Sequence, residues 1–205
     1  LKSYLKNFPV EFIEKKILRD NNAQLFEREI KKNLRNKANI VITSGAVSAG
    51  KFDFIPDVIK KFKLKIMFKG VSIRPGKPIM YAKFNKHTSF FGLPGNPISS
   101  AACFRFFVQP YLFFSLGLEV KDKIEARLVN SFSKKNNFTR FIKGKLFKSK
   151  NQIKFRVLSG QESFRIKSFV KSNSWGVFPN GKSLFKKGDK IKCTGLSIFG
   201  GINLN

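Results

Sequence analysis

A run of small and hydroxyl-bearing residues follows a stretch that is typical of a buried parallel strand, Asn39-Ile-Val-Ile-Thr43. The run is Thr43-Ser-Gly-Ala-Val-Ser-Ala-Gly50. Small residues let backbone N–H groups approach an anion, a following helix adds its dipole, and the hydroxyls of Thr43, Ser44 and Ser48 add further donors. The spacing fits neither a Walker A loop nor a GxGxxG fingerprint. An anion-binding turn is predicted here, with an ordinary tight turn as the alternative.

A second motif, Arg74-Pro-Gly-Lys-Pro78, places two cations three residues apart in a turn that prolines stiffen. Such a turn can hold a tetrahedral oxyanion at a small entropic cost. A basic surface turn is the alternative.

A third motif, Phe91-Gly-Leu-Pro-Gly-Asn-Pro97, precedes Ile98-Ser-Ser100 and a helical pattern. Asn96 is a good helix N-cap and Pro97 suits a first helical turn, so a plain helix start is one interpretation. The other is a second anion-binding edge at a helix N-terminus.

Two carboxylates near these motifs are candidate Mg²⁺ ligands, because a hard cation prefers oxygen and neutralises phosphate. They are Asp20 and Asp53, and the alternative for Asp53 is a helix N-cap. His87 is interpreted as a surface residue and Cys103 as a core residue.

The net charge of +29, from 41 basic and 12 acidic residues, suggests a polyanion partner or compositional drift. Most of the basic residues are Lys and 25 residues are Phe, so drift is the preferred interpretation and a nucleic-acid partner is not favoured. The two cysteines, Cys103 and Cys193, form neither a metal motif nor a disulfide framework, which makes a reducing cytoplasm the default location.

Strand patterns alternate with helical patterns through residue 116, which predicts a three-layer α/β/α domain over residues 1–116. The expected strands are 10–13, 39–43, 64–68, 79–84 and 89–92, and the expected helices are 22–34 and 53–62. Residues 98–118 predict a buried helix that Pro110 breaks near its end, not a membrane span. Residues 117–205 show short alternating strands at 123–130, 140–147, 152–158, 175–178 and 190–193, which predict a small β-barrel domain.

In their order and spacing the motifs resemble the molybdopterin molybdenumtransferase family, the MoeA and gephyrin E-domain group. The matching segments are Ile17-Leu-Arg-Asp20, Thr43–Gly50, Asp53-Phe54, Arg74–Pro78, Phe91–Pro97 and, more weakly, Gly160-Gln161 and Trp175–Pro179. The chain departs from the family pattern at Ala46, where Gly is usual, and at Arg74, where Lys is usual. A positive φ at Ala46 is expected to cost about 1 kcal/mol.

The resemblance implies an enzyme of molybdenum cofactor biosynthesis that inserts molybdate into adenylylated molybdopterin and releases AMP. It implies catalytic roles for Asp20, Asp53 and Lys77, with Mg²⁺ at Asp20 and Asp53. It implies substrate binding by Thr43, Ser44, Gly45, Ser48, Arg74, Gly76, Lys77, Pro94, Gly95, Asn96 and Ser99, with Arg74, Lys77, Ser48 and Ser99 facing molybdate. It also implies a homodimer in a longer protein, of which this chain is a C-terminal piece that lacks the first strand of the α/β domain. We therefore expect the chain to be inactive alone.

Two alternatives of the same fold stay open at this point. A molybdopterin adenylyltransferase shares the α/β fold and the Gly-rich loop, but is not expected to carry a barrel or the Arg74–Pro78 turn. A non-enzymatic scaffold of the gephyrin kind is the other.

Overall fold

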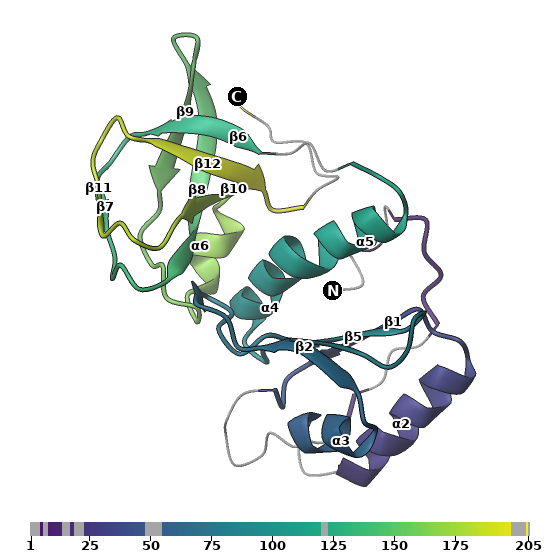
Figure 1. The fold of residues 1–205 in the computed structure, drawn as a ribbon. Helices are drawn as coiled ribbons and strands as arrows, with labels where there is room; N and C mark the ends of the chain where they lie inside the picture. Colours follow the sequence, from purple (N-terminus) through teal and green to yellow (C-terminus); the bar gives the residue numbers. More distant parts are fainter. Residues whose placement is uncertain are drawn as a thin grey trace. The chain divides into compact units, whose positions relative to one another are not determined.

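The computed structural model describes residues 5, 8–13, 17–18, 23–47, 55–119, 123–197 and 204, and the chain forms two compact units (Figure 1). The first, here the α/β unit, comprises Leu1–Val71 and Gly76–Cys103. The second, here the barrel unit, comprises Ser72–Pro75 and Phe104–Asn205. The short segment Ser72–Pro75 therefore leaves the α/β unit and joins the barrel unit.

The α/β unit is built on a sheet with the strand order β1-β5-β4-β2. Strands β1 (Ile40–Ser44) and β5 (Ser89–Leu93) are parallel, whereas β4 (Met80–Lys83) is antiparallel to both β5 and β2 (Lys65–Lys69). Residues 84–88 are too few for a crossover helix, so β4 and β5 form a hairpin. The sheet is mixed, and the parallel pair sits at one side of it.

Helices cover both faces of this sheet, which confirms the predicted three-layer architecture (Figure 1). Helices α2 (Ala23–Arg35) and α3 (Ile55–Lys61) lie on one face, and α4 (Pro97–Cys103) lies on the other. The apolar stripe of α2 buries Phe26 and Ile30. These side chains pack with Ile59 of α3 and with Met80 and Phe90 of the sheet.

Five strands of the barrel unit form a closed sheet, which confirms the predicted barrel. They follow the order β10-β12-β6-β9-β8, and β8 pairs back with β10. Their bounds are β6 (Ile124–Leu128), β8 (Thr139–Ser149), β9 (Gln152–Val157), β10 (Ser174–Phe178) and β12 (Lys190–Gly195). Three short strands, β3 (Ile73–Arg74), β7 (Phe132–Ser133) and β11 (Leu184–Phe185), and helix α6 (Ile166–Val170) complete the unit.

Two glycines make room for one buried ring in the barrel. A Cβ at Gly144 would lie 2.1 Å from Cζ of Phe155, and a Cβ at Gly176 would lie 2.8 Å from the same atom. Phe155 is fully buried and packs beside Phe178. The barrel core therefore depends on the absence of side chains at these two strand positions.

The expectations for residues 10–13 and for Pro110 were wrong. Residues 10–13 form no strand, because no strand pairs with this segment in the described part of the chain. The side chains of Phe12 and Ile13 are exposed. Helix α5 (Gln109–Ser115) continues through Pro110, and a π-helical turn over Phe104–Val108 precedes it. Pro110 cannot donate to the carbonyl of Phe106, and the wider turn upstream accommodates the proline ring.

None of the helices in the described residues is long and apolar enough to cross a membrane.

Candidate functional site

The parallel pairing of β1 and β5 brings the first and third motifs to one edge of the sheet. Thr43 is in register with Gly92, and Ser44 with Leu93, so the loops that follow the two strands start side by side. The N–H of Gly45 donates to the carbonyl of Leu93 at 2.9 Å. A Cβ at Gly95 would lie 3.4 Å from Cα of Gly45. In an open α/β sheet, the carboxyl ends of parallel strands are where ligands bind.

The first loop is bent by two consecutive left-handed residues. Gly45 has a φ of +99° and Ala46 a φ of +52°. Ala46 therefore has the positive φ for which a cost of about 1 kcal/mol is expected. The next residue, Val47, is buried in the core. A Cβ at Gly92 would lie 2.6 Å from Cγ1 of Val47, so only glycine at position 92 leaves room for this side chain.

The second loop is organised by Asn96, whose side chain caps helix α4. Its Oδ1 accepts the N–H of Ile98 at 3.1 Å and the N–H of Ser99 at 3.2 Å. The hydroxyl of Ser99 donates to the same oxygen at 3.5 Å. Both interpretations of this motif are thus compatible, because the cap is present and the loop still lies at the ligand-binding edge.

A second serine ties the two loops together. The Ser100 hydroxyl donates to the carbonyl of Pro94, and Oγ of Ser44 lies 3.4 Å from Oγ of Ser100. Ser100 is buried whereas Ser44 is exposed, so this contact links the interior to the loop surface.

Thr43 differs from these neighbours, because its hydroxyl oxygen is buried and has no hydrogen-bond partner among the described residues. Thr43 is the last but one residue of β1 and is in register with Gly92. A buried hydroxyl without a partner carries a desolvation cost that a bound ligand would relieve. This orphaned group is the strongest structural sign of a ligand at the edge.

The Arg74–Pro78 turn does not keep its two cations in one unit. Arg74 lies in β3 of the barrel unit, and Lys77 lies in the α/β unit. Gly76 has a φ of +110°, and its carbonyl accepts the N–H of Ile79 at 3.1 Å. The side chain of Lys77 is exposed, and no carboxylate among the described residues forms an ion pair with it. The geometry leaves this ammonium available to an anion.

Three predicted site residues, Asp20, Ser48 and Asp53, lie outside the described residues. Helix α3 begins two positions after Asp53, which leaves its N-cap interpretation untested. No cluster of three or more His, Cys, Asp or Glu residues that suits a metal ion occurs in the part of the chain that is described.

The interpretation of Cys103 as a core residue is confirmed. Its side chain is fully buried, and burial raises the pKa of the thiol to about 12. A thiol with such a pKa holds its proton at neutral pH, which argues against a nucleophilic role.

Sequence reasoning missed two cations of β8, Arg140 and Lys143. The ammonium of Lys143 donates to the carbonyls of Gly160, Glu162 and Arg165 at 2.8, 3.0 and 3.2 Å. This side chain is 1% exposed, and burial lowers its pKa. The only sequence signal is a lysine between the apolar Ile142 and the tightly packed Gly144.

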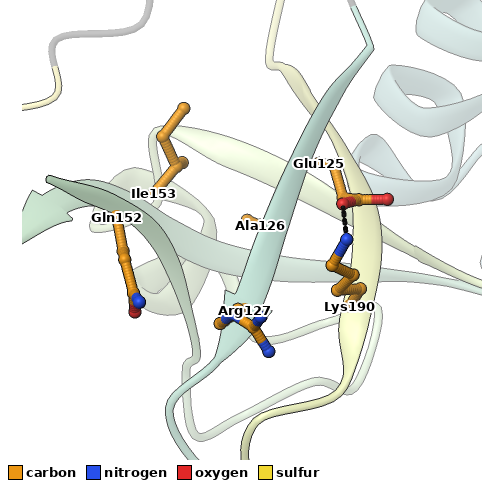
Figure 2. A pocket seen from close by; sticks show the side chains of 6 residues that line it. All are labelled: Glu125, Ala126, Arg127, Gln152, Ile153 and Lys190. Atoms are coloured by element: carbon orange, nitrogen blue, oxygen red, sulfur yellow. Dashed lines mark ion pairs between the residues drawn. The ribbon is translucent and has the colours of Figure 1, made fainter.

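A shallow hollow of about 140 Å³ lies on the barrel unit, and none of the predicted site residues lines it (Figure 2). Its lining residues are Glu125, Ala126, Arg127, Gln152, Ile153 and Lys190. Glu125 and Lys190 form an exposed ion pair of 2.7 Å across it. Small-molecule sites commonly enclose about 300–1,000 Å³, so this hollow is not assigned to a pterin.

Comparisons with known proteins find two family models along the chain. Residues 1–113 match the model of the probable molybdopterin-binding domain, and residues 125–196 match that of the MoeA C-terminal region, domain IV. A molybdopterin molybdenumtransferase of Staphylococcus aureus strain Mu50 is 33% identical over 165 residues, which are 80% of this chain and 39% of that protein. One of Staphylococcus epidermidis is 29% identical over 193 residues, or 93% and 45% of the two chains.

A molybdopterin biosynthesis MoeA protein from Pyrococcus horikoshii has a solved structure that matches with a TM-score of 0.68 at 27% identity, over 87% of this chain and 42% of that one. The chain thus spans about two fifths of the length of these relatives. Two domain matches that together cover most of the chain, on a fold that agrees with them, show that the chain belongs to the molybdopterin molybdenumtransferase family.

Proposed function

We propose that this protein acts in molybdenum cofactor biosynthesis, as a transferase that inserts molybdate into adenylylated molybdopterin and releases AMP. The observation that carries the proposal is the unpartnered, buried hydroxyl of Thr43 at the β1–β5 edge of a molybdopterin-binding domain. The names of the relatives in Staphylococcus supply the reaction class.

The loops at this edge are the proposed seat of the pterin and its pyrophosphate. Gly45 and Gly95 approach each other closely, so a flat or anionic ligand can lie against backbone without meeting a side chain. The proposed contacts come from Thr43, Ser44, Gly45, Ser48, Gly76, Pro94, Gly95, Asn96 and Ser99. Thr43 offers the one hydroxyl among the described members of this set that has no partner in the described part of the chain.

Molybdate is a dianion, and Arg74 and Lys77 are its proposed cationic ligands, with the hydroxyls of Ser48 and Ser99 beside them. Charge-assisted contacts of this kind are stronger than neutral hydrogen bonds. The absence of Asp and Glu between residues 61 and 117 keeps repulsive charge away from this part of the chain.

Mg²⁺ is proposed at Asp20 and Asp53, because two carboxylates next to a pyrophosphate loop supply the oxygen donors that this ion prefers. The ion would neutralise pyrophosphate charge while the adenylyl group leaves. A homodimer stays a prediction from the family resemblance, and a cytoplasmic location stays a prediction from the cysteine content.

The second domain favours this function over a molybdopterin adenylyltransferase. The match of residues 125–196 to the MoeA C-terminal region covers the closed five-stranded barrel. An adenylyltransferase of the same α/β fold is not expected to carry that domain.

The proposal is tested with the full-length protein by measuring cofactor formation from adenylylated molybdopterin at varied molybdate and Mg²⁺ concentrations. Lys77→Ala should raise the molybdate requirement roughly ten- to a hundredfold, which is the loss of one charge-assisted contact. Asp53→Ala should stall release of AMP at every molybdate concentration, with partial rescue by high Mg²⁺. Lys65→Ala, an exposed lysine of β2, is the matched control.

Thermal unfolding of each variant separates a binding defect from a lost helix cap at Asp53. If Lys77→Ala and Asp53→Ala gave the same phenotype, or Asp53→Ala lost only stability, the separate anion and metal roles would be refuted. If the wild-type protein formed no cofactor, the transferase function itself would be refuted.

A further inference from the structure

Two arginines that are 66 positions apart in the sequence lie side by side in the barrel unit. Strand β3 pairs in parallel with the start of β8, so that Ile73 is in register with Thr139 and Arg74 with Arg140. Register partners project from the same face of a sheet. Burial, and then the charge of Arg74, lower the pKa of Arg140, which agrees with two guanidinium groups within electrostatic reach.

Each guanidinium is held against an aromatic ring. Cζ of Arg74 lies 4.8 Å from the ring centre of Phe138, and Cζ of Arg140 lies 5.4 Å from the ring centre of Phe132. Stacking on a ring fixes the planar fork while its N–H donors stay free for another partner. Both forks are therefore oriented before any ligand arrives.

The barrel unit supplies little negative charge to this pair. Within the described residues neither guanidinium forms an ion pair. Glu162 attracts Arg140 from a distance, but its carboxylate lies 3.9 Å from Nε of Arg165. Adjacent like charges without a counter-ion are destabilising.

A third cation adds to the same positive region. Lys134 is buried, and its ammonium donates to the carbonyls of Phe138 and Lys135 at 2.8 and 3.1 Å. It also lies 5.5 Å from the centre of the Phe138 ring that carries Arg74. Lys134 and Arg74 thus share the Phe138 ring, and the charge of Arg140 contributes to the lowered pKa of Lys134.

We propose that Arg74 and Arg140 form a guanidinium pair that binds a tetrahedral oxyanion, with Lys134 contributing its charge behind them. Two planar forks match the oxygens of such an anion, and a dianion neutralises the two adjacent charges. The identity of the anion as molybdate rests on the proposed function. Arg140 is thereby assigned as an anion-binding residue that neither the motifs nor the family pattern indicates.

The direct test is calorimetric titration of the purified full-length protein with sodium molybdate, and separately with sodium sulfate, at constant ionic strength. Arg140→Gln and Arg74→Gln should each weaken molybdate binding roughly ten- to a hundredfold. Arg140→Lys should recover part of the loss. The double variant should lose less than the product of the two single losses, because both arginines hold one anion.

Arg156→Gln is the matched control, since Arg156 also stacks on a phenylalanine ring at 5.4 Å, faces Lys145 across the ladder, and is exposed. Its affinity should stay within twofold of wild type, and thermal unfolding should show every variant folded. Any of three results would overturn the inference. Arg156→Gln could lose as much molybdate affinity as Arg140→Gln, Arg140→Gln could keep the wild-type affinity, or the wild-type protein could bind no molybdate.

The two proposals fail separately. If the oxyanion binds through Arg140 but no cofactor forms, the pair stands and the transferase function is wrong. If cofactor forms and Arg140→Gln has unchanged molybdate affinity, the function stands and the pair is wrong.

Discussion

The β1–β5 edge of the α/β unit and the surroundings of Lys143 in the barrel unit are both polar and partly buried, but their polar groups are used differently. At the edge, the buried hydroxyl of Thr43 has no partner within the described residues. In the Arg74–Pro78 turn, Lys77 is exposed, and no carboxylate of the described residues forms an ion pair with it. In the barrel, the ammonium of Lys143 has three carbonyl acceptors, and Gln161 Nε2 donates to two more, those of Lys143 and Leu158.

The difference separates polar residues that hold the fold from polar residues that are left for a ligand. A saturated network stabilises one conformation, and removing a member leaves buried acceptors unpaired. An unsaturated buried group costs stability, and a bound molecule that supplies its missing partner relieves that cost. Exposure alone would not show this, because Lys143 and the Thr43 hydroxyl are both buried.

The largest expected effect is the loss of the Lys143 ammonium. Lys143→Met should lower the free energy of unfolding by about 3 kcal/mol, because three buried carbonyls lose their donor and only part of that cost is offset by removing a buried charge. Urea unfolding followed by the fluorescence of Trp175, the single tryptophan and a residue of β10, measures the effect in the barrel. Lys145→Met, on an exposed position of the same strand, should change stability by less than about 0.5 kcal/mol. Similar losses in both variants would refute the structural role.

The same lysine should make stability depend on pH. Burial lowers the pKa of Lys143 in the folded protein, so the unfolded chain binds this proton more strongly. Unfolding free energy then rises with pH between the lowered pKa and the ordinary lysine value of about 10.4. The unfolding free energy of Lys143→Met should rise less over this pH range than that of the wild-type protein. If the two proteins showed the same dependence of unfolding free energy on pH, the buried charge of Lys143 would not be its cause.

A smaller effect is expected from the cap of α4. Asn96→Ala removes the oxygen that accepts the N–H groups of Ile98 and Ser99, and should cost about 1 kcal/mol. Asn96→Asp keeps an acceptor oxygen and should recover most of it. Guanidinium unfolding followed by far-ultraviolet circular dichroism gives the unfolding free energies of both variants. If Asn96→Ala were as stable as wild type, the cap would not stabilise the protein.

The smallest expected effect is a gain. Ala46 holds a φ of +52°, which glycine adopts without strain, so Ala46→Gly should raise stability by up to about 1 kcal/mol. Arg28→Gly, at an exposed position inside α2, is the control and should lower it. A loss of stability in Ala46→Gly would show that the loop does not carry the strain that this φ implies.

The features that could be predicted from sequence are those set by local pattern. Continuous β-branched residues predicted β1 (Ile40–Ser44), the apolar spacing of residues 22–34 predicted α2, and Asn96 predicted the start of α4. Both loops at the β1–β5 edge were expected because each follows a strand and contains small residues.

The missed features depend on contacts between distant residues. The β3–β8 register that places Arg74 beside Arg140, and the three carbonyls around Lys143, exist only once the barrel has closed. Residues 10–13 have the composition of a strand but no partner to pair with among the described residues. Local pattern thus gave the loops of the candidate site and missed its second arginine.

The most direct measurement replaces Thr43 with Val, which has the same shape and no hydroxyl. If the hydroxyl is kept for a ligand, Thr43→Val should be as stable as wild type or more stable, because a buried unpaired group is removed. The same protein should bind molybdopterin about tenfold more weakly in an anaerobic titration followed by pterin fluorescence. Unchanged pterin affinity together with lower stability would contradict the assignment of this edge as the binding site.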